Sequence, residues 1–295
     1  MIDIKYKIVY CTPALYSAGG IERVVSLKAN YFADVLGYDV TIIVTEGKNS
    51  NSFFHLSDKV EVINLDLNFE EIWNVSFIEK VFLYLKKQRN YKKLLKRELM
   101  RIRPDITITT LRREINFINE INDGSRKIGE QHLSRSNYRR TDPRFTNICE
   151  KFFYRWWKNR IVYSLTKLDK LVVLTPDAAS EWTEVKNIIM IPDPLPIKVE
   201  SCSTRSSKRV ITIGRYSYEK GYDLLLKVWS IVEKKLSDWQ LDIYGEGSMY
   251  ATLKNLIKIY KAKNITIHNF TADISQEYTN SSICVVTSYF EGFSL

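Results

Sequence analysis

The sequence has few cysteines, glycines and prolines, and each shortage excludes a class of protein. Its four cysteines are scattered, with no pair at C-x-x-C spacing and no histidine nearby at ligand spacing. They are typical of reduced thiols in a cytosolic protein, which argues against a disulfide scaffold and a zinc site. Eleven glycines and seven prolines in 295 residues exclude a fibrous or largely disordered chain.

Long hydrophobic runs are also missing. No apolar stretch approaches the roughly 20 residues that a membrane-spanning helix needs, and residues 1–5 do not resemble a signal peptide. We therefore expect a cytoplasmic protein, either free or held peripherally on the inner face of the cytoplasmic membrane. Its length suits about two domains, at roughly 100–200 residues each.

The net charge of +10 is concentrated in residues 86–103, which hold nine basic residues and one acid, Glu98. Apolar residues recur there at helical spacing, which predicts a helix with one buried stripe. Its basic face is either an ordinary solvated surface or a surface that contacts anionic lipid headgroups. We expect no nucleic-acid partner, because the basic residues do not alternate with aromatics over a groove. The predicted buried stripe consists of Val81, Leu85, Leu95, Leu99 and Ile102.

Strand and helix patterns alternate along the chain. Strands separated by helices of ten or more residues predict βαβ units and parallel sheets covered on both faces. Residues 192–196, Pro-Asp-Pro-Leu-Pro, interrupt this alternation, because proline can continue neither a helix nor a central strand. We therefore predict an α/β protein with two Rossmann-like, doubly wound domains, residues 1–195 and 196–295. They would face a cleft, with ligands beyond the carboxyl ends of the strands.

The segment from Gly214 to Gly221 reads Gly-Arg-Tyr-Ser-Tyr-Glu-Lys-Gly. A strand ends in a glycine, Arg215 follows, and the pair Lys220-Gly221 opens a helix. This places two cations and a helix N-terminus at the carboxyl end of one strand, an arrangement that suits a diphosphate. The alternative is an ordinary strand-to-helix loop with exposed charges.

Two further glycine-containing turns follow. Residues 241–248, Leu-Asp-Ile-Tyr-Gly-Glu-Gly-Ser, form a second strand-to-glycine turn. Tyr250 stands where a dinucleotide-binding G-x-G-x-x-G pattern needs its third glycine, which argues against a NAD-binding protein. Residues 288–293, Ser-Tyr-Phe-Glu-Gly-Phe, place a carboxylate just after a strand and beside a glycine.

In this order and spacing, the three elements resemble the donor-binding half of the family 4 retaining glycosyltransferases of the GT-B fold (glycosyl transferases group 1). That family's pattern is G-R-x-x-x-x-K-G, then a G-x-G turn, then S-x-x-E-G-F at the head of a motif with two glutamates. In the first half of the chain, residues 18–23, Ala-Gly-Gly-Ile-Glu-Arg, resemble the family's glycine loop after its first strand. The resemblance spans the whole chain and implies a GT-B fold.

The resemblance implies a role for each matching residue. Arg215 and Lys220 would bind the donor diphosphate and stabilise the charge left when the sugar departs. Gly19 and Gly20 would approach the same phosphates.

His132, which follows a strand of the first domain, and Glu291 would be the catalytic residues beside the donor sugar. The same resemblance implies further nucleotide or sugar contacts for Gly245, Glu246, Gly292 and Phe293.

The implied activity is transfer of a sugar from a nucleotide-diphosphate sugar, with retention, to a saccharide or lipid-linked saccharide acceptor. Such reactions build cell-surface polysaccharides such as capsule or lipopolysaccharide. No Asp-x-Asp metal clamp is found, so we expect no metal or other cofactor. Two alternatives stay open: a nucleotide-sugar 2-epimerase of the same fold, and a non-catalytic fragment that binds a sugar nucleotide.

The second glutamate of the family motif has no counterpart in this sequence. Seven residues separate the two glutamates in the family, so the partner of Glu291 would fall four positions after Leu295. We therefore expect a second domain that is truncated at its C-terminus and a chain that is poorly active as it stands.

Overall fold

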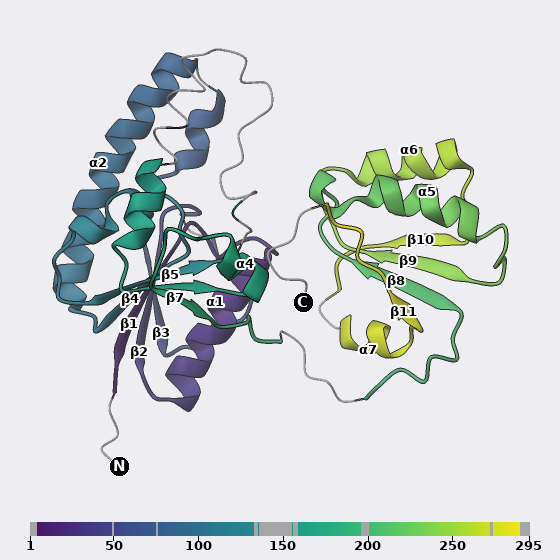
Figure 1. The fold of residues 1–295 in the computed structure, drawn as a ribbon, viewed down its shortest axis with the longest axis horizontal. Helices are drawn as coiled ribbons and strands as arrows, with labels where there is room; N and C mark the ends of the chain where they lie inside the picture. The colour runs from purple at the N-terminus through teal and green to yellow at the C-terminus, as the bar shows by residue number, and fades with distance from the viewer. Residues whose placement is uncertain are drawn as a thin grey trace. The chain divides into compact units, whose positions relative to one another are not determined.

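The computed structural model describes residues 5–48, 50–74, 76–132, 135, 155, 159–195, 201–271 and 274–289 (Figure 1). The chain divides into two compact units, Met1–Pro196 and Ile197–Leu295, called unit 1 and unit 2 below. Each unit is built on one parallel sheet with helices against it, which confirms the predicted α/β class. Among the described residues, no helix combines the length and apolar character needed to cross a membrane.

Unit 1 contains a seven-stranded parallel sheet in the order β3-β2-β1-β4-β5-β6-β7. The chain first adds strands on one side of β1 and then crosses to the other side with β4. Loops diverge at such a switch, and the carboxyl ends of the strands there are where α/β sheets bind ligands. The strands are β1 (Lys7–Thr12), β2 (Asp39–Val44), β3 (Val60–Asn64), β4 (Ile106–Thr109), β5 (Arg126–Gln131), β6 (Lys170–Val173) and β7 (Ile188–Met190).

Alternate residues of β1 face two separate hydrophobic cores. Val9 and Cys11 belong to the core that includes the inner face of α2 (Phe77–Ile102), whereas Ile8 and Tyr10 belong to the core under α1 (Gly20–Asn30). Both faces of the central strand are therefore buried, as expected of a parallel sheet covered by helices. The shorter helical segments of the unit are η1 (Tyr31–Val35), η2 (Phe69–Asn74), η3 (Glu114–Asn116), η4 (Ile118–Glu120) and α4 (Pro176–Ser180).

Helix α2 is amphipathic, but its buried stripe is only partly the predicted one. Leu95 and Leu99 are fully buried, and burial of each such side chain stabilises the fold by about 1.5–3 kcal/mol. Leu85 was predicted inside and is 51% exposed, because the first turns of α2 extend past the sheet (Figure 1). The helix ends at Ile102, and its C-cap residue Arg103 has a left-handed backbone (φ 51°) directly before Pro104.

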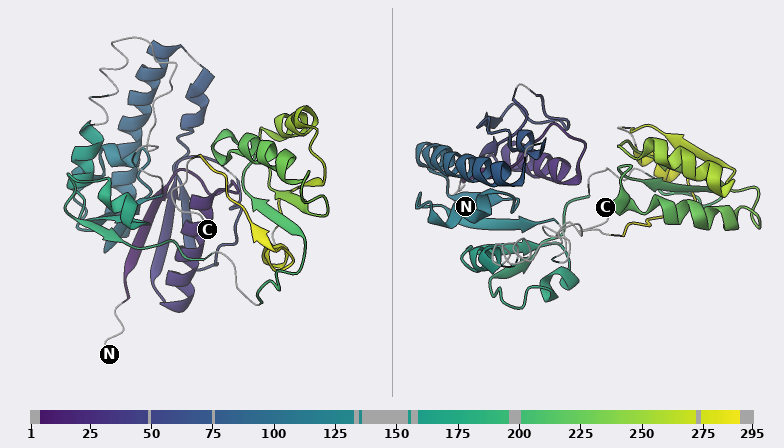
Figure 2. Two further views of the ribbon diagram at one scale, coloured as in Figure 1. Left: turned by 45° about the vertical axis from the view of Figure 1, so that its right-hand side comes forward. Right: turned by 90° about the horizontal axis from the view of Figure 1, so that it is seen from above.

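Unit 2 contains a four-stranded parallel sheet in the order β10-β9-β8-β11. Helices α5 (Tyr222–Val232) and α6 (Tyr250–Tyr260) run side by side along it (Figure 2), and Leu226 and Leu253 pack in the core that they cover. A smaller core joins Ile211 to α7 (Ile274–Thr279). The strands are β8 (Arg209–Ile213), β9 (Gln240–Tyr244), β10 (Ile265–His268) and β11 (Ile283–Cys284).

Candidate functional site

His132 follows β5 directly and belongs to a buried cluster of four ionisable side chains. Its Nδ1 lies 3.2 Å from Asp193 Oδ2, and its Nε2 lies 3.5 Å from Glu130 Oε2. Lys28, on α1, donates to Glu130 Oε2 at 3.2 Å and to Asp193 Oδ1 at 3.4 Å. The side chains of Lys28, Glu130, His132 and Asp193 are 12%, 8%, 5% and 6% exposed. We call these four residues the His132 cluster.

The electrostatics of the His132 cluster favour an imidazolium. Burial alone would lower the pKa of His132, but the hydrogen bond to Asp193 and the interaction with Glu130 raise it overall. Burial alone would raise the pKa values of Glu130 and Asp193, and His132 and Lys28 lower both overall. Two cations then face two carboxylates, so the buried cluster carries no net charge when His132 is protonated.

Tyr10 borders the same cluster from β1. Burial first, and the negative charge of Glu130 second, raise the pKa of its phenol well above the ordinary value. Tyr10 therefore stays neutral over the physiological pH range.

The loop from β1 to α1 places Gly19 and Gly20 at the N-terminus of α1. A Cβ on Gly20 would meet nothing within 4 Å, so the fold itself does not require glycine there. A Cβ on Gly19 would lie 2.0 Å from Glu22 Oε2, and the Glu22 carboxylate accepts a hydrogen bond from Ser17 at 2.6 Å. A carboxylate therefore covers Gly19, and a phosphate could reach this residue only if the flexible Glu22 side chain moved.

The loop from β8 to α5 carries both predicted diphosphate ligands. Arg215 is exposed and makes no ion pair with any residue that the structure describes. Lys220 ends η5 (Tyr218–Lys220) and folds back so that its Cε lies 3.2 Å from the position a Cβ of Gly214 would take. Gly221 has φ 61°, and a Cβ there would lie 2.1 Å from the carbonyl oxygen of Thr287. The glycines of this motif thus allow the loop to hold Lys220 at the end of β8.

The second glycine turn, at Gly245, packs directly against the first, at Gly214. A Cβ on Gly245 would lie 2.0 Å from the Gly214 carbonyl oxygen, and the Tyr216 backbone amide donates to the Glu246 carbonyl at 2.7 Å. Gly245 therefore permits close backbone approach between the two loops, a structural reason for glycine that the sequence does not reveal. The side chain of Glu246 is exposed.

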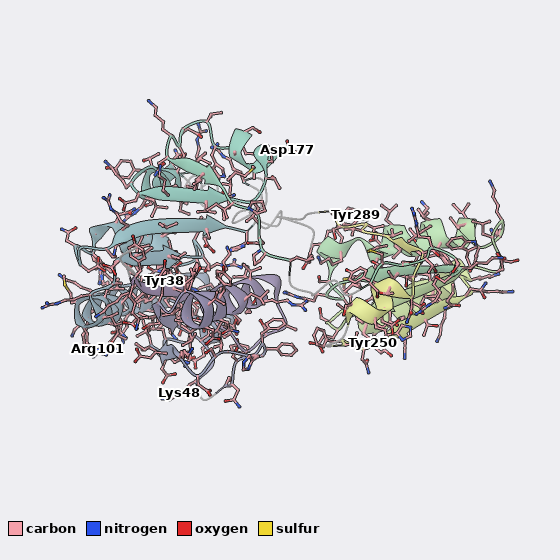
Figure 3. The ribbon with its side chains drawn as sticks, turned by 90° about the horizontal axis from the view of Figure 1, so that it is seen from below. Tyr38, Lys48, Arg101, Asp177, Tyr250 and Tyr289 are labelled. Atoms are coloured by element: carbon pink, nitrogen blue, oxygen red, sulfur yellow. The ribbon has the colours of Figure 1, made fainter. Side chains whose placement is uncertain are left out.

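Glu291, Gly292 and Phe293 lie outside the described residues. Tyr289, which precedes them in the chain, forms hydrogen bonds with the β8–α5 loop and with the first turn of α5. The backbone amide of Tyr289 donates to the Glu219 carbonyl at 2.8 Å, and its hydroxyl donates to Asp223 Oδ2 at 2.8 Å. Tyr289 and the α6 residue Tyr250 are both labelled in Figure 3. The third sequence motif therefore begins beside the first one.

Sequence reasoning predicted His132 but none of its three partners Lys28, Glu130 and Asp193. It also assigned no role to His268, whose Nε2 lies 2.8 Å from Asp242 Oδ1 and whose ring stacks on Tyr244 at 4.2 Å. The position of Glu130 could have indicated a role, because Glu130 and His132 both lie at the carboxyl end of a strand, β5. Nothing in the local sequence indicates that Lys28 lies opposite them.

Each unit holds a parallel α/β sheet, as in proteins of the GT-B fold, and comparison with a solved structure supports that fold. The crystal structure of a variant of S. aureus TarM, in complex with fondaparinux, alpha-GlcNAc-glycerol and UDP, superimposes with a TM-score of 0.71. The alignment covers 98% of this chain and 82% of TarM, at 15% identity. At that identity the likeness shows the fold alone.

Residues 198–295 match the protein family described as "Glycosyl transferases group 1". An uncharacterized glycosyltransferase of Haemophilus influenzae is 29% identical over 286 residues, 95% of this chain and 73% of that protein. The amylovoran biosynthesis glycosyltransferase AmsD of Erwinia amylovora is also 29% identical, over 43% of this chain and 39% of AmsD. These matches identify the chain as a glycosyltransferase, and the match to the group 1 family model lies within unit 2.

Proposed function

We propose that the protein transfers a sugar from a nucleotide-diphosphate sugar, with retention at the anomeric carbon, to a saccharide or lipid-linked saccharide acceptor. The relative AmsD takes part in amylovoran biosynthesis, and the S. aureus TarM structure contains UDP and alpha-GlcNAc-glycerol. Those neighbours support a role in cell-surface polysaccharide synthesis. They also make UDP the first nucleotide to test.

The observation that carries this proposal is the β8–α5 loop. It holds an exposed guanidinium, Arg215, and the ammonium of Lys220 at the carboxyl end of a parallel strand, next to the start of α5. Cations and backbone amides in this position suit a diphosphate. When the bond from sugar to phosphate breaks, negative charge develops on the leaving diphosphate. Fixed cations stabilise that charge without a metal ion.

In this proposal the residues near the donor sugar are His132 and, from the family resemblance, Glu291. The His132 cluster supplies a charged imidazole ring whose Nδ1 is held by Asp193. A ring held in one orientation can contact a sugar hydroxyl without first losing rotational freedom. No covalent sugar–enzyme intermediate is required, because the departing phosphate itself can accept the proton of the incoming acceptor hydroxyl.

Nucleotide binding tests the donor site separately from catalysis. Saturating UDP should raise the unfolding temperature of the chain, since a ligand that binds only the folded state stabilises it. Arg215→Ala and Lys220→Ala should remove most of that increase. Lys227→Ala, which removes an exposed cation from the outer surface of α5, is the matched control and should leave the increase intact. A full increase in both test variants would refute the phosphate site.

Transfer itself is tested with UDP-glucose and UDP-N-acetylglucosamine and a panel of saccharide and lipid-linked acceptors. The anomeric proton coupling of the product reports its configuration by NMR. Retention predicts an α-linked product from these α-linked donors. A β-linked product would exclude the retaining mechanism, and a C2-epimerised nucleotide sugar formed without acceptor would identify the epimerase instead.

A further inference from the structure

Helix α2 carries a line of exposed side chains that sugar transfer as proposed above does not use. Five of them are cations and three are large apolar groups; Phe82, Leu85 and Met100 are 68%, 51% and 42% exposed. We call this set the α2 stripe. It consists of Phe82, Leu85, Lys86, Arg89, Lys93, Lys96, Met100 and Arg103.

The α2 stripe follows one side of the helix. At about 100° and 1.5 Å per residue, its members stay within about 100° of the helix circumference and extend over about 30 Å. The opposite side holds Tyr91, Leu95 and Leu99, which are buried in the core of unit 1. The α2 stripe therefore points away from the sheet.

The remaining basic residues of segment 86–103 are engaged within the protein. Each of them bonds a carboxylate or a backbone carbonyl of unit 1, and one of them, Arg101, is labelled in Figure 3. Lys87 and Lys92 bond groups outside the helix, whereas Arg97 and Arg101 share the carboxylate of Glu98 on α2 itself. The pairs are Lys87 with the carbonyls of Leu67 and Asn68 at 2.5 and 2.7 Å, Lys92 with Glu120, and Arg97 and Arg101 with Glu98 at 3.0 and 2.9 Å.

The five cations of the α2 stripe make no ion pair with any residue in the described part of the chain. Between Phe82 and Arg103 the only acid is Glu98, which lies on the buried side. The result is a line of five uncompensated positive charges, a surface that attracts a partner of opposite charge. The sequence could not separate these five cations from the four that are bonded internally.

We infer that the α2 stripe binds the surface of a lipid bilayer that contains anionic lipids. The cations would contact lipid phosphates, and Phe82, Leu85 and Met100 would enter the boundary between headgroups and acyl chains. The inference goes beyond the proposed transfer activity and does not depend on which donor is used. It would hold the enzyme at the surface where a lipid-linked acceptor resides.

The apolar members favour a bilayer over nucleic acid. Phosphates of a duplex attract the same cations, but large exposed apolar side chains at both ends of the line gain nothing from contact with phosphates in water. At a bilayer the same side chains move from water into the boundary between headgroups and acyl chains while the cations bind the lipid phosphates. An amphipathic helix that combines a basic face with exposed Phe and Leu is typical of such surfaces.

The test is sedimentation of the whole 295-residue chain with two kinds of vesicle, phosphatidylcholine alone and phosphatidylcholine mixed with phosphatidylglycerol. We expect binding to the mixed vesicles, lost at high salt. The triple variant Arg89→Gln, Lys93→Gln, Lys96→Gln should bind about 100-fold more weakly, because each cation near an anionic surface contributes about fivefold. Phe82→Ser with Leu85→Ser should weaken binding about tenfold, with the salt dependence preserved.

A matched variant separates the α2 stripe from the overall charge of +10. Lys227→Gln, Lys234→Gln, Lys235→Gln removes three exposed cations from unit 2 and should bind mixed vesicles as the wild type does. All variants change exposed side chains, so thermal unfolding should be unaltered. Equal loss in both triple variants, full binding by the Arg89 variant, or equal binding to uncharged vesicles would overturn the inference. Binding of the wild type to a DNA duplex but not to mixed vesicles would also overturn it.

Discussion

Asp193 Oδ2 lies 3.2 Å from Nδ1 of His132, although the two residues are 61 positions apart and Asp193 lies between two prolines. The contact orients the imidazole ring and places a negative charge beside it. Lys28 holds the other oxygen of the same carboxylate at 3.4 Å. Asp193 therefore connects the end of β5 to α1 through one buried side chain.

Replacing Asp193 with asparagine should lower the pKa of His132. The variant keeps the shape of the side chain but removes the charge that raises the pKa, while the opposing effect of burial remains. We expect a decrease in the pKa of His132, measured by NMR titration of its ring. Asp177→Asn, at an exposed position labelled in Figure 3, is the control and should leave the titration unchanged. Identical titrations in all three proteins would exclude the assigned contact.

The His132 cluster should also make stability depend on pH in two opposite directions. The raised pKa of His132 contributes stability below its ordinary value of 6.5, and this is lost as pH rises through the folded value. The lowered pKa values of Glu130 and Asp193 contribute stability above their ordinary values of 4.5 and 3.8, lost as pH falls through the folded values. Urea unfolding across pH should show the cluster's contribution largest between about pH 5 and 6.5.

His132→Gln isolates the histidine part of that dependence. The difference in unfolding free energy between wild type and variant should shrink as pH rises above 6.5 and towards 9. A constant difference over this range would mean that His132 is neutral in the folded protein.

Lys28→Met should destabilise unit 1 by about 3 kcal/mol, because it leaves two buried carboxylates facing one imidazolium. The double variant Lys28→Met with Glu130→Gln removes one charge of each sign and should recover most of the loss. Urea unfolding of both variants measures the effect. Equal destabilisation by the single and double variants would show that packing of the lysine stem, and not charge balance, is what matters.

Local pattern was enough to predict most of the architecture. The alternating strand and helix patterns form parallel sheets, and the strand predicted to end at Gly214 forms β8. The motif between Gly214 and Gly221 also falls at the carboxyl end of a strand, as its spacing predicts. These features depend on short-range periodicity and on the residues that interrupt it, so one stretch of sequence contains the signal.

What could not be predicted depends on contacts between distant segments. Lys28 and Asp193 are 165 positions apart, and no local pattern pairs them. Leu85 matches the helical period of the buried stripe, yet it is exposed because the end of the sheet decides which turns of α2 are covered. The reason for glycine at position 245 is likewise a carbonyl from another loop, at Gly214.

Gly221 and Gly20 should respond differently to alanine. Gly221→Ala puts a Cβ in a left-handed conformation and 2.1 Å from the Thr287 carbonyl oxygen, so we expect a loss of more than about 2 kcal/mol. Gly20→Ala adds a Cβ in open space within a helix and should change stability by less than about 1 kcal/mol. Thermal unfolding with and without UDP checks both. A tolerated Gly221→Ala with normal UDP binding would contradict the described loop.

A crystal structure of the chain with bound UDP tests the central claim most directly. The account predicts the diphosphate at the carboxyl end of β8, with phosphate oxygens within about 3 Å of the Arg215 guanidinium and the Lys220 ammonium. UDP bound elsewhere, or a diphosphate held by other groups while both cations point away from it, would contradict the account.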